Sequence, residues 1–210
     1  MLSIQLNNLG KKYNREWIFK DLDYQIHANQ KLLISGGNGS GKSTVLQVLS
    51  GFITPNEGSL TYRLGDKNIA IEKIKNHISF ASPYLQLLED LTLQELIDHI
   101  KIYKPFVNQI STNEVIGLLE LSPAKNKYIK QFSSGMKQRL KLGLAILCDT
   151  PLLLLDEPVS NLDKNAISWY KNIITEHSLD RTIIVCSNAV GDEHFFCESE
   201  LVVTDFKPLR

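Results

Sequence analysis

The chain has 210 residues, of which 43% are hydrophobic and 22% are charged, which is ordinary globular composition with enough apolar mass for one large α/β domain. Its 23 basic and 23 acidic side chains give a formal net charge of zero. This balance excludes the overall positive field expected of a nucleic-acid-binding protein, so we expect no nucleic acid partner.

The three cysteines, Cys148, Cys186 and Cys197, have no CxxC spacing and are odd in number. We therefore expect free or buried thiols in a reducing cytosol rather than a disulfide framework. The N-terminal residues lack the order of a signal peptide, and the longest apolar run is far shorter than the ~20 residues that cross a bilayer. The expected location is cytoplasmic, and any membrane-spanning part must come from another chain.

The first third of the chain alternates apolar and polar residues as strands with one buried face do. We expect strands at residues 4–6 and 18–26 in an antiparallel layer on the N-terminal side. Residues 31–35 read KLLIS, a short apolar run that ends in glycines, and this pattern predicts a buried strand. A helix is expected over residues 44–49, and residues 54–58 have the composition of a turn.

The middle of the chain, from about residue 93 to 121, spaces its apolar residues as helices do. One predicted helical face consists of Leu93, Leu96, Ile97 and Ile100, and a second consists of Val115, Leu118 and Leu119. The stretch predicts a helical subdomain at approximately residues 88–135, inserted between strands.

The last third alternates helices with short apolar strands. Helices are expected at residues 136–147 and 165–177, and strands at residues 152–155 and 183–185. Such alternation predicts a mostly parallel sheet flanked by helices on both faces, within a single domain over residues 1–210.

A phosphate-binding pattern, G-x-x-x-x-G-K-[ST], matches residues 36–44, which read GGNGSGKST. Glycines let the backbone turn so that successive N–H groups face phosphate oxygens, and the following helix directs its positive end at the same anion. Lys42 adds a positive charge near the β- and γ-phosphates, and the Ser43 hydroxyl suits Mg²⁺. The candidate ATP-binding residues of this loop are Gly36, Gly37, Asn38, Gly39, Ser40, Gly41, Lys42, Ser43 and Thr44. The chain is thus expected to have a P-loop NTPase core with ATP and Mg²⁺ as its cofactors.

Two carboxylates end the buried strand at residues 152–158, which read LLLLDEP. Ligands of open α/β sheets bind at the carboxyl ends of strands. Asp156 is the candidate Mg²⁺-associated acid, together with Ser43, and Glu157 is the candidate general base for the attacking water. A solvated acidic pair is the alternative, and the phosphate loop earlier in the chain favours the catalytic interpretation.

A third motif distinguishes among P-loop families. Residues 132–139 read FSSGMKQR and resemble the LSGGQ signature of ABC-type ATPases. Phe132 stands for the Leu and Ser134 for the first Gly, whereas Ser133 and Gly135 match. These residues at a helix start would supply a hydroxyl and free N–H groups to an anion, and the alternative is an ordinary N-capped helix.

The resemblance to ABC transporter ATP-binding subunits covers nearly the whole chain. Residues 160–163 read SNLD, directly after the acidic strand, and are similar to the D-loop of that family, with Asp163 as a candidate site residue. Tyr13 stands where the family has an aromatic ring that stacks on adenine. Trp17 and Phe19 are close by in the chain, and a core position for Tyr13 is the alternative.

The family also implies partners. Two cassettes, identical or different, would form a head-to-tail dimer in which each ATP lies between the phosphate loop of one and the signature of the other. A separate transmembrane subunit would be driven by closure and opening of the dimer, on the cytoplasmic face of a membrane. Residues 83–91 read PYLQLLEDL and lie where the family docks its membrane subunit, although ordinary core is the alternative interpretation.

Two positions depart from the family pattern. The expected Gln falls on Pro83, which has no side-chain oxygen, and Gln86 would replace it only in a rearranged loop. The expected His falls on Asn188, which can donate to a phosphate oxygen but cannot become cationic. With Glu157 intact, we expect hydrolysis to survive at a reduced rate, and Asn188 is kept as a candidate catalytic residue.

Two other functions remain open at this stage. One is a soluble ABC ATPase that acts on ribosomes or DNA, although such proteins usually carry two cassettes or long insertions. The other is a regulatory module that binds ATP without hydrolysing it, for which Pro83 and Asn188 would be the explanation.

Overall fold

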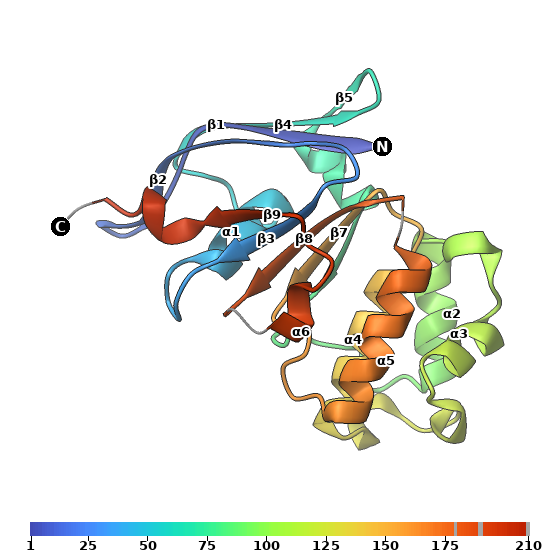
Figure 1. Ribbon diagram of the computed structural model, residues 1–210. Coiled ribbons are helices and arrows are strands. Elements are labelled where there is room, and N and C mark those ends of the chain that lie inside the picture. Colours follow the sequence, from blue (N-terminus) through green and yellow to red (C-terminus); the bar gives the residue numbers. More distant parts are fainter. Residues whose placement is uncertain (179, 189–190, 209–210) are drawn as a thin grey trace. The chain divides into compact units, whose positions relative to one another are not determined.

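The computed structural model describes residues 1–178, 180–188 and 191–208 (Figure 1). The chain divides into two compact units. The first contains Met1–Phe80, Pro151–Glu157 and Asp180–Arg210, and the second contains Ala81–Thr150 and Pro158–Leu179.

The first unit has an antiparallel sheet in the order β2-β1-β4-β5. Its strands are β1 (Leu2–Tyr13), β2 (Glu16–Ile26), β4 (Glu57–Leu64) and β5 (Lys67–Ile69). Leu2, Ile4 and Leu6 of β1 are buried and alternate with less buried residues, as expected for a sheet with one covered face. Ile4 lies opposite Ile26 of β2 and Tyr62 of β4, so the apolar faces of the three strands coincide.

A second sheet in the same unit has the order β6-β7-β8-β3-β9. Its strands are β3 (Lys31–Ser35), β6 (Ile78–Ala81), β7 (Leu152–Asp156), β8 (Thr182–Ser187) and β9 (Ser199–Val202). β3, β7 and β8 pair in parallel, and their register places Ser35 beside Ser187 and Asp156 beside Cys186. The carboxyl ends of these three strands therefore meet at one edge, where sheets of this kind bind ligands.

Helix α1 (Lys42–Leu49) shares one core with both sheets. Its Val45 and Leu46 belong to the same buried cluster as Ile4 of β1 and Leu154 of β7. The buried Tyr62 hydroxyl donates to the Leu49 carbonyl oxygen at 3.0 Å, which satisfies one of the carbonyls left unpaired at the end of a helix. The unit also contains α6 (Gly191–His194) and the 3₁₀ helices η1 (Ile71–Asn76) and η5 (Val203–Phe206).

The second unit is helical (Figure 1). Its α-helices are α2 (Leu93–Tyr103), α3 (Thr112–Leu118), α4 (Ser134–Leu147) and α5 (Lys164–His177). Its 3₁₀ helices are η2 (Val107–Gln109), η3 (Ser122–Ala124) and η4 (Ile129–Gln131). Thr92 with Glu95 forms a capping box at the start of α2, and Ser111 with Glu114 does the same for α3.

The expected fold class is confirmed: a largely parallel sheet, an antiparallel layer from the N-terminal region, and a helical part between strands. The helix expected at 136–147 begins two residues earlier, at Ser134, because the Ser133 side chain caps it. The boundary at approximately 88–135 stays a prediction, and the second unit is larger than that range because α4 and α5 belong to it. Across the residues that the structure describes, no helix is both long and apolar enough to span a bilayer.

Candidate functional site

The phosphate loop joins β3 to α1 and depends on glycine at its last turn. Gly41 is the N-cap of α1 with φ +107°, in the region that only glycine adopts readily. A Cβ atom at Gly41 would lie 2.4 Å from Ile18 Cγ2, whereas one at Gly37 would meet no atom within 4 Å. The loop therefore requires glycine at position 41 for two separate reasons, backbone conformation and the close approach of Ile18.

Lys42 is only 5% exposed, and its ammonium group points back into the loop. Its Nζ donates to the carbonyl oxygens of Gly36 at 2.9 Å and Gly37 at 3.2 Å. It also donates to Oδ1 of Asn188, which follows β8. All three acceptors are neutral, so an anion placed in this loop would be a stronger partner for the ammonium than any of them.

Ser43 and Asp156 meet beside this lysine. The Ser43 hydroxyl donates to Asp156 Oδ1 at 3.0 Å, and the Asp156 side chain is 3% exposed at the end of β7. Two ligands at right angles in an octahedral Mg²⁺ shell lie about 2.9 Å apart, because each is roughly 2.0–2.1 Å from the metal. The two oxygens thus have the chemistry and the spacing of neighbouring Mg²⁺ ligands.

Asn188 connects Lys42 to the candidate base. Its Nδ2 donates to Glu157 Oε1 at 2.7 Å, while its Oδ1 accepts from Lys42. The amide orientation matches the charges, since the donor faces a carboxylate and the acceptor faces an ammonium. Glu157 has φ +44°, a strained value for a non-glycine residue, and its backbone N–H donates to the Cys186 carbonyl oxygen at 2.9 Å. Lys42, Asn188 and Glu157 thus form one continuous chain of side-chain hydrogen bonds.

Cys186 contacts the backbone of Lys42, and it was not among the site residues predicted from the sequence. Its Sγ donates to the Lys42 carbonyl oxygen at 3.4 Å. Complete burial raises the pKa of the Cys186 thiol, and the nearby Asp156 carboxylate raises it further. The group therefore stays a neutral thiol that supports the start of α1.

Tyr13 is 47% exposed at the end of β1, so the alternative of a core position is wrong. The Lys11 ammonium lies 5.2 Å from the centre of its ring. Phe19 is fully buried instead, and Trp17 lies beside the ammonium groups of Lys12 and Lys20, at 4.8 and 5.1 Å. Of the three aromatic residues, Tyr13 has the exposed ring that adenine stacking requires.

The signature-like residues begin α4 in the second unit. Ser133 is the N-cap, and its hydroxyl oxygen accepts from the Met136 N–H at 3.2 Å. Ser133 and Ser134 are exposed, and Gly135 follows in the first turn. The N-cap is thus observed, and it does not decide between the two interpretations, because the Ser133 hydroxyl proton and the first N–H groups of the helix can still donate to an anion.

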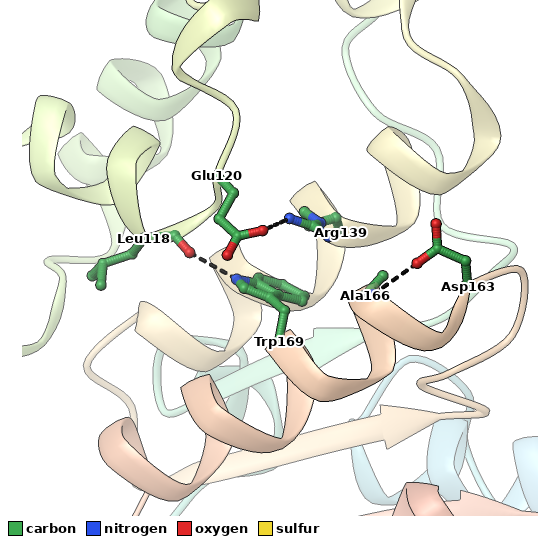
Figure 2. A network of polar contacts seen from close by, with 6 residues as sticks. All are labelled: Leu118, Glu120, Arg139, Asp163, Ala166 and Trp169. Atoms are coloured by element: carbon green, nitrogen blue, oxygen red, sulfur yellow. Dashed lines mark hydrogen bonds and ion pairs between the residues drawn. The ribbon is translucent and has the colours of Figure 1, made fainter.

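A network of polar contacts joins α4 to α5 and to the end of α3, as Figure 2 shows. Arg139 of α4 contacts the Glu120 carboxylate and lies 4.9 Å over the Trp169 ring of α5. Trp169 Nε1 donates to the Leu118 carbonyl oxygen at 2.7 Å. The Asp163 carboxylate caps α5 by accepting from the Ala166 N–H at 2.8 Å. These contacts fix the helix that carries the signature against the helix that follows the D-loop-like segment.

Pro83, at the position where the family pattern has its Gln, lies in the second unit. Pro83 is half-buried, and its carbonyl oxygen accepts from Lys141 Nζ at 2.6 Å. Gln86 is exposed, and its substitution for the missing Gln stays a prediction. Tyr84 is 83% exposed and Leu88 is 54% exposed, so neither belongs to the core.

The fold and the phosphate loop define a P-loop ATPase. The sequence model of the family described as "ABC transporter" matches residues 19–160, and the chain belongs to this family as an ATP-binding cassette. It is 30% identical over 208 residues to the uncharacterized ABC transporter ATP-binding protein YybJ of Bacillus subtilis, with 94% of this chain and 91% of that protein covered.

Another relative is the human ATP-binding cassette sub-family A member 10, which is 29% identical over 98% of this chain. The chain spans only 14% of the length of that protein. Among solved structures, a dimeric post-hydrolysis state of the ATP-binding cassette MJ0796 bound to ADP and Pi has a TM-score of 0.78, with 23% identity over 99% of this chain and 97% of that one. This structural likeness shows the same fold.

Proposed function

We propose that the chain binds Mg-ATP and hydrolyses it in a dimer of cassettes, and that this cycle drives a separate membrane subunit. The observation that carries the proposal is the hydrogen-bonded chain from Lys42 through Asn188 to Glu157. It joins the group that would hold the γ-phosphate to the group that would activate water. A module that only binds ATP has no need of an oriented carboxylate there.

Ser43 and Asp156 are the residues that would hold Mg²⁺. Magnesium in such sites is usually held by one or two protein oxygens together with phosphate oxygens and water, which fits one hydroxyl and one carboxylate. When bound, the metal would neutralise charge on the β- and γ-phosphates. Lys42 would hold phosphate oxygens in the same loop.

Glu157 is the proposed general base. Its carboxylate would accept a proton as the water oxygen attacks the γ-phosphorus, and ADP would leave with the electrons of the broken P–O bond. Asn188 would orient this carboxylate through the 2.7 Å hydrogen bond to Oε1. A neutral amide can do this without a change in its own protonation, so Asn188 would replace the orienting function of a histidine but not its positive charge.

Ser133, Ser134, Gly135 and Asp163 are proposed to serve the nucleotide held by a second cassette. Support comes from the exposure of Ser133 and Ser134 at the start of α4, where N–H groups are available to an anion. Tyr13 would stack on adenine, supported by its exposed ring. The apolar side chains of Tyr84, Leu85 and Leu88 would contact the membrane subunit.

The test is ATP turnover of the purified chain with Mg²⁺ across a range of protein concentrations, beside Glu157→Gln. We expect turnover to rise faster than linearly with concentration, because each complete site needs two chains. We expect the variant to lose roughly a hundredfold or more of its turnover while keeping its affinity for a fluorescent ATP analogue.

Unchanged turnover in Glu157→Gln would contradict the role of this carboxylate. Strictly linear dependence on concentration, at levels where the chain is monomeric in light scattering, would contradict the shared site. Absence of turnover at every concentration, with tight ATP binding, would instead favour the regulatory module.

A further inference from the structure

A single loop of the second unit carries the three exposed apolar side chains described above. We call residues 83–91 the anchored loop. Tyr84, Leu85 and Leu88, which all lie within this loop, are 83%, 41% and 54% exposed. Burial of these side chains does not fix the position of the loop. Its position therefore depends on other contacts, which are described next.

The first anchor is Lys141 of α4. Its Nζ donates to the Pro83 carbonyl oxygen at 2.6 Å and lies 3.5 Å from the Ser82 carbonyl oxygen. Desolvation by burial lowers the pKa of Lys141, and the positive charge of Lys137 lowers it further, as expected for an ammonium group partly shielded from water beside these carbonyls. The contact holds the position at which the family pattern has its glutamine.

The second anchor is at the other end of the loop. Lys137, one helical turn before Lys141, forms an ion pair with Glu89 in which Nζ and Oε1 are 2.5 Å apart. The Lys130 N–H donates to the Glu89 carbonyl oxygen at 3.1 Å, and the Ile129 N–H donates to the Leu91 carbonyl oxygen at 3.0 Å. Both ends of the anchored loop are thus bonded to α4 or to the segment that leads into it.

Residues four apart on a helix share a face, so Lys137 and Lys141 reach the two ends of the loop from one side of α4. The same helix begins at Ser134, only one turn before Lys137. We propose that Lys137 and Lys141 are positioning residues that couple the anchored loop to the signature at the start of α4. This rests on the proposed function, in which the loop meets a membrane subunit and the signature meets a partner's nucleotide.

The coupling works in both directions, because linkage between two sites is reciprocal. A partner pressing on the loop would move the signature, and a nucleotide engaging the signature would restrain the loop. The second direction is testable with the purified chain and ATP alone. In this cassette the lysine pair would perform the mechanical function for which Pro83 has no side-chain donor or acceptor.

The experiment measures amide hydrogen exchange with and without Mg-ATP in the Glu157→Gln variant. The same measurement is made after Lys141→Met, Lys137→Met or both are added to that variant. Methionine keeps an apolar stem of similar length and removes the charge. Lys127→Met is the matched control, because Lys127 is an exposed lysine of the same unit. Dimerisation is followed by light scattering on the same samples.

We expect ATP to slow exchange in the anchored loop at least threefold in Glu157→Gln and in the Lys127→Met control. In the double lysine variant that protection should disappear, while protection of residues 36–45 and the dimer fraction stay unchanged. Lys141→Arg, which still donates to the carbonyls, should restore most of the loop protection and covers the case in which Lys141→Met fails to fold.

Two results would overturn the inference. If ATP protects the loop equally with and without the lysine pair, in a chain that dimerises, the inferred coupling is contradicted and the proposed function stands. If Glu157→Gln does not dimerise with ATP at any concentration, both the inferred coupling and the proposed function are contradicted.

Discussion

The two half-sites of this cassette are built in different ways. At the phosphate loop, charged and polar side chains from the start of α1, from the end of β7 and from the residues directly after β7 and β8 bond to one another, and Lys42 and Asp156 are nearly inaccessible to water. At the signature, the functional groups are backbone N–H groups and exposed serines at the start of α4, with the side-chain network placed behind them (Figure 2).

The two regions therefore have different tasks: the first orients catalytic side chains, and the second exposes backbone N–H groups to an anion. A side-chain network at the phosphate loop fixes the direction of each group, as catalysis requires. A helix start stabilised from behind only has to present N–H groups at the correct place and angle. Changes in the first region should therefore alter nucleotide binding or turnover, and changes in the support of the second should alter stability first.

The largest effect is expected from Gly41→Ala. The φ of +107° and the 2.4 Å approach of Ile18 Cγ2 both oppose a Cβ atom there. Strain and overpacking of about 1–3 kcal/mol each should lower ATP affinity by roughly a hundredfold. Gly37→Ala is the matched control, because its Cβ would meet no atom within 4 Å. Titration with a fluorescent ATP analogue measures both, and equal affinities would show that the loop tolerates a side chain at position 41.

The next effect is expected from Asn188→Ala. A hydrogen bond to a charged group is worth about 1.5–3 kcal/mol, so release of the Glu157 carboxylate should lower the turnover number by roughly tenfold or more. ATP affinity should change much less. Asn188→Asp keeps the shape but cannot donate to Glu157 when ionised, and it should lose at least as much turnover. Phosphate release at saturating ATP measures both, and wild-type turnover in Asn188→Asp would show that orientation of Glu157 is unimportant.

The smallest effect is expected from Trp169→Phe. The ring under Arg139 is kept, but the 2.7 Å hydrogen bond from Nε1 to the Leu118 carbonyl oxygen is lost. A partly buried carbonyl oxygen that loses this partner should cost about 1 kcal/mol, which should lower the Tm by roughly 2–4 °C. ATP affinity of the chain at low concentration should not change. A fall in affinity as large as that of Gly41→Ala would contradict the separation of the two half-sites.

Much of the fold could be predicted from the sequence because its signals are local. KLLIS is a strand over the expected residues, and the phosphate-loop pattern is followed by α1 as expected. The hydrogen-bonded chain of the site could not be predicted this way. Asn188 is separated by 146 residues from Lys42 and by 31 from Glu157, and the direction of its amide depends on its contacts with both.

The contact of Lys141 with the anchored loop was missed for a similar reason. The two partners are 58 residues apart, and a lysine four positions after another lysine is usually read as a solvated helix face. The signal that could have found it is the combination of this pair with Pro83. A proline at a position that needs a polar side chain indicates that another residue holds the loop.

The neutral amide at position 188 also changes how charge is balanced when nucleotide arrives. The side chains of the phosphate site carry one formal positive charge, on Lys42, and two formal negative charges, on Asp156 and Glu157. A polyanionic nucleotide entering such a field depends heavily on the divalent cation that accompanies it. We therefore expect strong positive heterotropic cooperativity between Mg²⁺ and ATP, in which each ligand raises the affinity for the other by the same factor.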